Sequence, residues 1–283
     1  MDEPINYYTA SDKFHLACSK GDLTKAKKYN DYILTETLAE ACRNGHLHVA
    51  QWLIETYPNI KLACNTNSVF SVTCASGKLE IAKWLVSKFP TINSNDADTF
   101  AFNYACSNKY IEVAKWVVET FPNINITTES LICSTSNLDM FYWIIEKYPN
   151  FENYDIYEVF IYACSNNKLE IAEYLIKKCP TLNIFAKDNL ALIKACQYGY
   201  FEIVKLIITN IPKDNAPKFN NMALLVACHG NHNLIVEFLI NNRIYSDMIT
   251  VDSTIVICQL KIKYTNFTNE IKNILIDHNL INL

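Results

Sequence analysis

The stretch that decides the fold runs from residue 70 to residue 90 and reads FSVTCASGKLEIAKWLVSKFP. It contains Cys74, with a glycine three places later, a tryptophan ten places later and a proline sixteen places later. These residue types are scarce, since the 283 residues include only 11 Cys, 5 Gly, 4 Trp and 8 Pro. Their relative spacing is therefore a sensitive marker of repetition elsewhere in the chain.

The same spacing recurs along the chain with a period near 32 residues. All four tryptophans lie ten places after a cysteine, and six of the eight prolines lie sixteen places after one. A period between about 20 and 50 residues indicates a solenoid or another repeat array. The cysteines that share the frame are Cys18, Cys42, Cys74, Cys106, Cys133, Cys164, Cys196, Cys228 and Cys258.

Each period predicts two helices joined by a tight turn. Apolar residues lie four places before the cysteine, one place before it and at the cysteine, which is one face of a helix. The glycine or asparagine three places later tolerates the left-handed conformation that ends a helix. A second helix follows, as in Leu79 to Val86, and the proline ends it because proline lacks an N–H. The segments after the prolines, such as Thr91 to Asp98, are predicted to be loops.

These residues resemble the ankyrin repeat family, whose pattern T-P-L-H-x-A-A-x-x-G-H-x-x-V-V-x-x-L-L spans about 33 residues. The match is carried by Phe14 to Cys18 and by Ala41 to Leu53, with cysteine at the second alanine. The resemblance implies an all-α solenoid of about nine helix-turn-helix units. Because the family's exit sequence is replaced here, as at Tyr57-Pro58-Asn59-Ile60, we expect irregular loops between the repeats.

A single repeat domain is expected over residues 1–283. It would consist of an N-terminal capping unit (1–34), a repeat array (35–247) and a C-terminal capping unit (248–283). Repeats of this size bury their apolar faces only against neighbours, so the end units must act as caps. The style of the repeats resembles divergent ankyrin proteins of giant DNA viruses and amoebae.

Composition and charge exclude several other classes of protein. Half of the residues are hydrophobic and 19% are charged, which is not the composition of a disordered chain or a coiled coil. The net charge of −4 argues against nucleic-acid binding. The longest apolar run, Met222 to Cys228, is too short to cross a membrane, and the first residues carry no secretory signal. We expect a monomer in the cytoplasm, which would be the host cytoplasm if the protein is viral.

Two sets of residues suggest a metal site, namely Cys42 with His46 and His48, and Cys228 with His229 and His232. Equivalent cysteines on stacked helices would lie about 8 to 10 Å apart, too far to share one ion. Reduced, packed thiols are therefore favoured, and no metal or cofactor is expected. A cysteine–histidine nucleophile stays open as an alternative, although nine repeating cysteines favour packing and a non-enzyme.

The remaining hypothesis is a non-catalytic scaffold that binds a partner protein on a concave face made by the first helices and the loop tips. A variable position lies two places before the cysteine, where several side chains are apolar or aromatic; their packing against the loops is the alternative. Loop residues Asn95, Asp96 and Asp98 would supply a polar rim. A more specific alternative is a substrate adaptor for a host ubiquitin ligase. The candidate contact residues on the first helices are Val72, Tyr104, Leu131, Tyr162 and Val226.

Overall fold

The structure, a computed structural model, describes residues 10–29, 35–57, 65–90, 92, 95–150, 154–211, 222–242, 244, 270, 273, 274 and 277. Within this part of the chain there are sixteen helices and no strands, which confirms the prediction of an all-α fold. None of the described helices is long and apolar enough to cross a bilayer. The residues fall into two compact units, Met1–Pro149 and Asn150–Leu283. The assignment of residues 1–283 to one domain stays a prediction.

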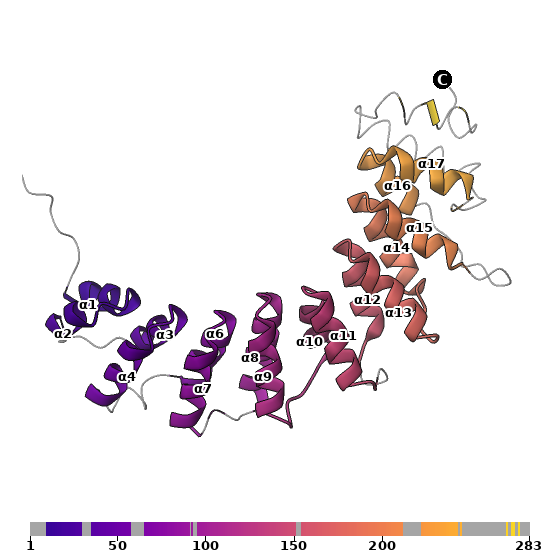
Figure 1. The fold of residues 1–283 in the computed structure, drawn as a ribbon. Coiled ribbons are helices and arrows are strands. Elements are labelled where there is room, and N and C mark those ends of the chain that lie inside the picture. Colours follow the sequence, from indigo (N-terminus) through magenta and orange to yellow (C-terminus); the bar gives the residue numbers. More distant parts are fainter. Residues whose placement is uncertain are drawn as a thin grey trace, which may run out of the picture. The chain divides into compact units, whose positions relative to one another are not determined.

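The first unit is a row of five helix pairs that follow one another in chain order (Figure 1). Each first helix packs against its own second helix, and neighbouring first helices within the unit pack against one another. The first helices are α1 (Ala10–Ser19), α3 (Thr35–Arg43), α6 (Thr66–Ala75), α8 (Asn95–Ser107) and α10 (Thr128–Ser134). The second helices are α2 (Leu23–Lys28), α4 (Leu47–Thr56), α7 (Leu79–Lys88), α9 (Ile111–Thr120) and α11 (Leu138–Lys147).

The second unit contains three further pairs built in the same way. Helices α12 and α14, and then α14 and α16, pack side by side as neighbouring first helices. The ninth predicted pair, near Cys258, and most of the C-terminal cap (248–283) lie outside the described residues. The three pairs are α12 (Ile156–Ser165) with α13 (Leu169–Lys178), α14 (Ala186–Tyr198) with α15 (Phe201–Thr209), and α16 (Met222–His229) with α17 (Asn233–Asn241).

The helix ends lie where the repeated glycine and proline predict them. Gly21, Gly45, Gly77 and Gly199 have φ values between 71° and 88°, in the left-handed region that favours glycine. Five second helices (α4, α7, α9, α11 and α13) stop two residues before a proline, and the intervening residue is extended, as at Phe89 with φ −126° and ψ 84°. Proline disfavours the helical conformation in the residue before it, which explains this fixed stop.

The repeated cysteines form a buried line through the first helices. Cys18, Cys42, Cys74, Cys106, Cys164, Cys196 and Cys228 are at most 2% exposed, and all are free thiols. A small residue precedes nearly every one of them, which lets neighbouring first helices approach closely. The prediction of packed cysteines is therefore confirmed at these seven positions.

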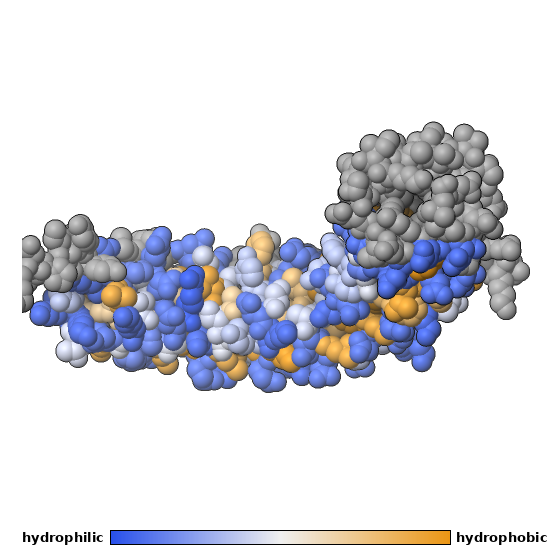
Figure 2. Space-filling view, turned by 90° about the horizontal axis from the view of Figure 1, so that it is seen from above, coloured by the Kyte–Doolittle hydropathy of each residue, from blue (hydrophilic) through white to orange (hydrophobic). Residues whose placement is uncertain are grey.

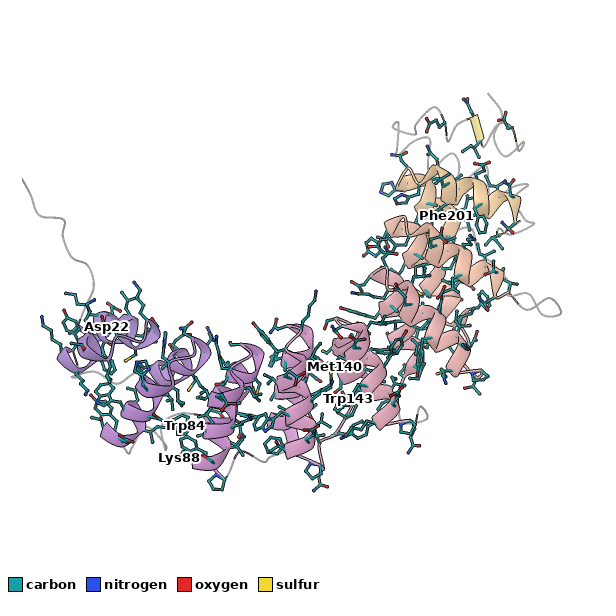
Figure 3. The ribbon with its side chains drawn as sticks, in the orientation of Figure 1. Asp22, Trp84, Lys88, Met140, Trp143 and Phe201 are labelled. Carbon is teal, nitrogen blue, oxygen red and sulfur yellow. The ribbon has the colours of Figure 1, made fainter. Side chains whose placement is uncertain are left out.

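Aromatic side chains of the second helices reach back to the preceding repeat. The ring of Trp52 meets that of Phe14 at 6.3 Å between centroids, and the ring of Trp116 meets that of Phe70 at 6.2 Å, both edge to face. Such pairs stabilise a fold beyond the area that they bury. Figure 3 labels Trp84 on α7 and Trp143 on α11, the corresponding residues of two other repeats. The tryptophans are half-buried, so they fill the space between repeats rather than a closed core.

The turns of neighbouring repeats also stack on one another. A Cβ added to Gly77 would lie 2.5 Å from Cδ1 of Tyr110 in the next repeat, and one added to Gly21 would lie 2.5 Å from Nδ1 of His46. The turn glycine is therefore required twice, once for its positive φ and once for the close approach of the next repeat.

Candidate protein-interaction surface

The first helices expose two positions per repeat, six and two places before the buried residue that is usually the cysteine. We call these positions the first-helix face. Every one of these side chains is exposed or half-exposed, whereas the residues between them are mostly buried. In the first unit they are Asp12, Leu16, Glu36, Glu40, Ser68, Val72, Phe100, Tyr104, Glu129 and Cys133. In the second unit they are Glu158, Tyr162, Leu190, Lys194, Met222 and Val226.

One predicted contact residue, Leu131, does not lie on this face. It is fully buried in α10, so its assignment as an exposed residue was wrong. In α12 the last two buried residues are Ala163 and Cys164. The corresponding buried residues at the end of α10 are Ser134 and the C-cap Thr135. Thr135 therefore occupies the place that cysteine holds in the other repeats.

The cause is a turn that is two residues shorter. The second helix begins five residues after Cys164 but only three residues after Thr135. Cys133 therefore lies ten residues before the tryptophan of α11, as in the other repeats. Its own helix is nevertheless rotated about its axis compared with the first helices of those repeats. Its thiol lies on the first-helix face, half-exposed, at the position that Tyr104 and Tyr162 occupy elsewhere.

The predicted polar rim also changes place. Asn95, Asp96 and Asp98 were expected in a loop, but α8 begins at Asn95 and includes all three. Carboxylates favour the first turn of a helix because they offset its positive end, and asparagine favours the same end as a cap. A run of Asn and Asp therefore begins a helix as readily as it makes a loop. The side chains of these three residues lie outside the described part of the chain.

An aromatic pair on α8 was missed from the sequence. The rings of Phe100 and Tyr104 stack, with centroids 6.4 Å apart and planes 25° apart. Phe100 is 52% exposed and Tyr104 is 51% exposed, although both are large. The i, i+4 spacing of two aromatic residues places them on one helix face, and this signal was available in the sequence. Tyr162, at 39% exposure, is the corresponding tyrosine of the second unit.

The charge of the first-helix face differs between the two units. In the first unit the face carries four carboxylates and no basic side chain, whereas in the second it carries one of each sign, Glu158 and Lys194. One of the four acids, Glu40, forms an ion pair with Arg43 at 2.8 Å. On the side of the first unit that Figure 2 shows, hydrophobic side chains lie as separate spots among hydrophilic ones.

The histidines near the turns contact the backbone of the preceding repeat. Nε2 of His46 lies 3.0 Å from the carbonyl oxygen of Ser19, and Nε2 of His48 lies 3.0 Å from that of Gly21. Nε2 of His232 lies 3.2 Å from the carbonyl oxygen of Gln197. Within the described residues no three His, Cys, Asp or Glu side chains come together as a metal-binding group. These histidines therefore link neighbouring repeats through side-chain to backbone contacts.

The thiols are held in their protonated form. Burial raises the pKa of Cys18 and of Cys228 to about 12, and it raises the pKa of Cys164 further. Burial also raises the pKa of half-exposed Cys133, against a hydrogen bond from Ser107 that lowers it. Since the thiolate is the reactive species, this environment is the opposite of that of a catalytic cysteine.

Comparison with known proteins agrees with this repeat geometry. A family model described as ankyrin repeats (3 copies) matches residues 38–129 and again residues 130–216, more than half of the chain. A search of the curated proteins finds no match. Ankyrin repeats generally mediate protein–protein interaction and are typically non-catalytic. With paired helices, left-handed turns and a matching family model, the chain belongs to the ankyrin repeat family.

Proposed function

We propose that this chain is a non-catalytic scaffold that binds a partner protein through its first-helix face. The observation that carries the proposal is the contrast between neighbouring positions of the same helices. The buried positions repeat the same residue types, a large Phe or Leu followed by Ala and Cys, whereas the exposed positions change from repeat to repeat. The buried set builds the array, and the exposed set is free to be selected for a partner.

The exposed set also has the composition of a binding surface. Tyr104 and Tyr162 are large aromatic side chains that remain about half exposed, and Phe100 adds a second ring beside Tyr104. Tyrosine is enriched among the residues that contribute most of the binding energy at protein interfaces. Val72 and Val226 are half-exposed and add apolar area to the same rows.

The test is a pull-down from a lysate of the cells in which the protein is made. The intact chain is compared with the double variant Tyr104→Ala, Tyr162→Ala and with the control Leu234→Ala. Leu234 lies on a second helix and is 68% exposed, so its loss removes exposed apolar area away from the first-helix face. We expect the double variant to lose the partner and the control to retain it. Equal capture by all three proteins contradicts the proposal.

A further inference from the structure

The first unit offers an acidic surface with an aromatic centre. Asp12, Glu36, Glu40 and Glu129 occupy four of its ten first-helix-face positions, and no lysine or arginine occupies any of them. Among the described residues, neither Glu36 nor Glu129 forms an ion pair. Arg43 pairs with Glu40, whereas Glu36 and Glu129 contribute a negative field along the face.

The aromatic centre lies between the acidic positions. Phe100 and Tyr104 are on α8, which packs against α10 on one side and α6 on the other. Glu129 holds on α10 the same position as Phe100 on α8, so it lies one repeat away. Glu36 and Glu40 lie on α3, two repeats away in the opposite direction. The nearest lysine of a first helix in that direction, Lys13 on α1, lies one repeat further still.

From this arrangement we propose that the first unit binds an extended segment that contains arginine, and this inference rests on the function proposed above. The guanidinium group of one arginine would stack on the Phe100–Tyr104 pair and face the carboxylate of Glu129. Arginine fits this position better than lysine because its planar, weakly hydrated group stacks on aromatic rings and pairs with carboxylates. A second arginine would lie against Glu36 on α3.

The repeat geometry sets the spacing of the two arginines. Neighbouring helices pack about 8 to 10 Å apart, and an extended chain advances about 3.3 Å per residue. The segment therefore advances about three residues for each repeat, and α3 lies two repeats from α8. The two arginines should be about six residues apart.

The second unit provides a built-in control. Tyr162 holds the position of Tyr104, but its neighbour on the first-helix face, Glu158, is engaged by Lys187, and Lys194 adds a positive charge. The same segment should therefore find no comparable site there. The second unit differs from the first in both respects, because Tyr162 has Glu158 rather than a second aromatic ring at the neighbouring position and that carboxylate is already paired.

The experiment uses the full chain and a fluorescein-labelled peptide, Ser-Arg-Ser-Gly-Ser-Gly-Ser-Arg-Ser, with binding followed by fluorescence anisotropy. Tyr104→Ala should raise the dissociation constant about three- to fivefold, the size of an exposed cation–π contact, while Tyr162→Ala should leave it unchanged. Glu129→Lys should weaken binding at least as much, and added salt should weaken it further. A peptide with lysine in place of both arginines should bind more weakly.

An arginine site on the first unit is contradicted if the peptide does not bind, if the lysine peptide binds equally well, or if Tyr104→Ala and Tyr162→Ala have equal effects. A melting curve for each variant shows that the array is still folded. Failure here is distinct from failure of the proposed function. If the double variant loses its partner in the pull-down but the peptide does not bind, the scaffold proposal stands. Only the proposal of an arginine-containing segment is then rejected.

Discussion

The pairs α10–α11 and α12–α13 are built from the same two helices, yet they place equivalent sequence positions in opposite environments. Two places before its cysteine the first pair has Leu131, which is fully buried, and the second has Tyr162, which is 39% exposed. The difference comes from a turn that is two residues shorter after α10. A period read from second helices is therefore not a reliable guide to the register of first helices.

The largest expected effect comes from truncating the two side chains that this comparison contrasts. Leu131→Ala should lower the free energy of unfolding by about 2 to 5 kcal/mol, because it leaves a cavity in the core. Tyr162→Ala should change it by no more than about 0.5 kcal/mol, as is usual at the surface. Urea unfolding followed by circular dichroism measures both. Two small, equal losses of stability would show that α10 has the regular register after all.

The reactivity of the thiols of Cys133 and Cys164 compares the same two repeats without any substitution in the core. Half-exposed Cys133 should react with a chromogenic disulfide reagent in the native protein, whereas fully buried Cys164 should react only after the structure opens. Because opening of the core is costly, we expect labelling rates that differ by at least about 100-fold. The rate at Cys133 should increase with pH, since its raised pKa keeps most of the thiol protonated near neutrality.

Mass spectrometry of the labelled protein identifies the modified cysteine. Cys133→Ser is the control and should remove the fast reaction that is assigned to residue 133 without unfolding the protein. Fast labelling at Cys164 in the folded protein, or none at Cys133, would reverse the comparison.

The regular turns should be more sensitive to substitution than the short one. Gly77→Ala should cost about 2 kcal/mol, since alanine is strained at a φ of 71° and its Cβ would press on the ring of Tyr110. The short turn, Thr135 to Asn137, has no residue with positive φ. Ser136→Ala there should cost less, because it removes only the hydrogen bond from Oγ of Ser136 to the backbone of Cys106. Thermal melts of both variants test this order.

The smallest expected effect has the opposite sign. Lys109 holds the left-handed turn position with a φ of 65°, although it has a side chain. Lys109→Gly should raise the free energy of unfolding by up to about 1 kcal/mol, because relief of strain exceeds the extra entropy that glycine loses on folding. Denaturant unfolding measures both this variant and the control Lys115→Gly, which lies inside α9. The control should be less stable than the original protein, since glycine inside a helix is destabilising.

The sequence by itself determined the helix pairs, the period and the positions of the turns. Those features depend on local chemistry: glycine permits a left-handed turn, proline ends a helix, and apolar residues at helical spacing define a face. Each of these signals lies within a few residues of the element that it controls, so it can be read without knowledge of neighbouring repeats.

Only the tertiary structure decided which residues reach the surface of each first helix. The rotation of α10 depends on its packing against α8. The short turn that permits this rotation leaves the spacing from Cys133 to the tryptophan of α11 the same as in the other repeats, so that spacing gives no sign of it. The beginning of α8 at Asn95 was equally ambiguous, because Asn and Asp suit both a loop and a first turn. The exposure of a side chain depends on neighbouring repeats that are about 30 residues away in sequence. The exposure of Tyr104 and Tyr162 was predicted correctly because their repeats are regular, and that of Leu131 was not because its repeat has the shorter turn.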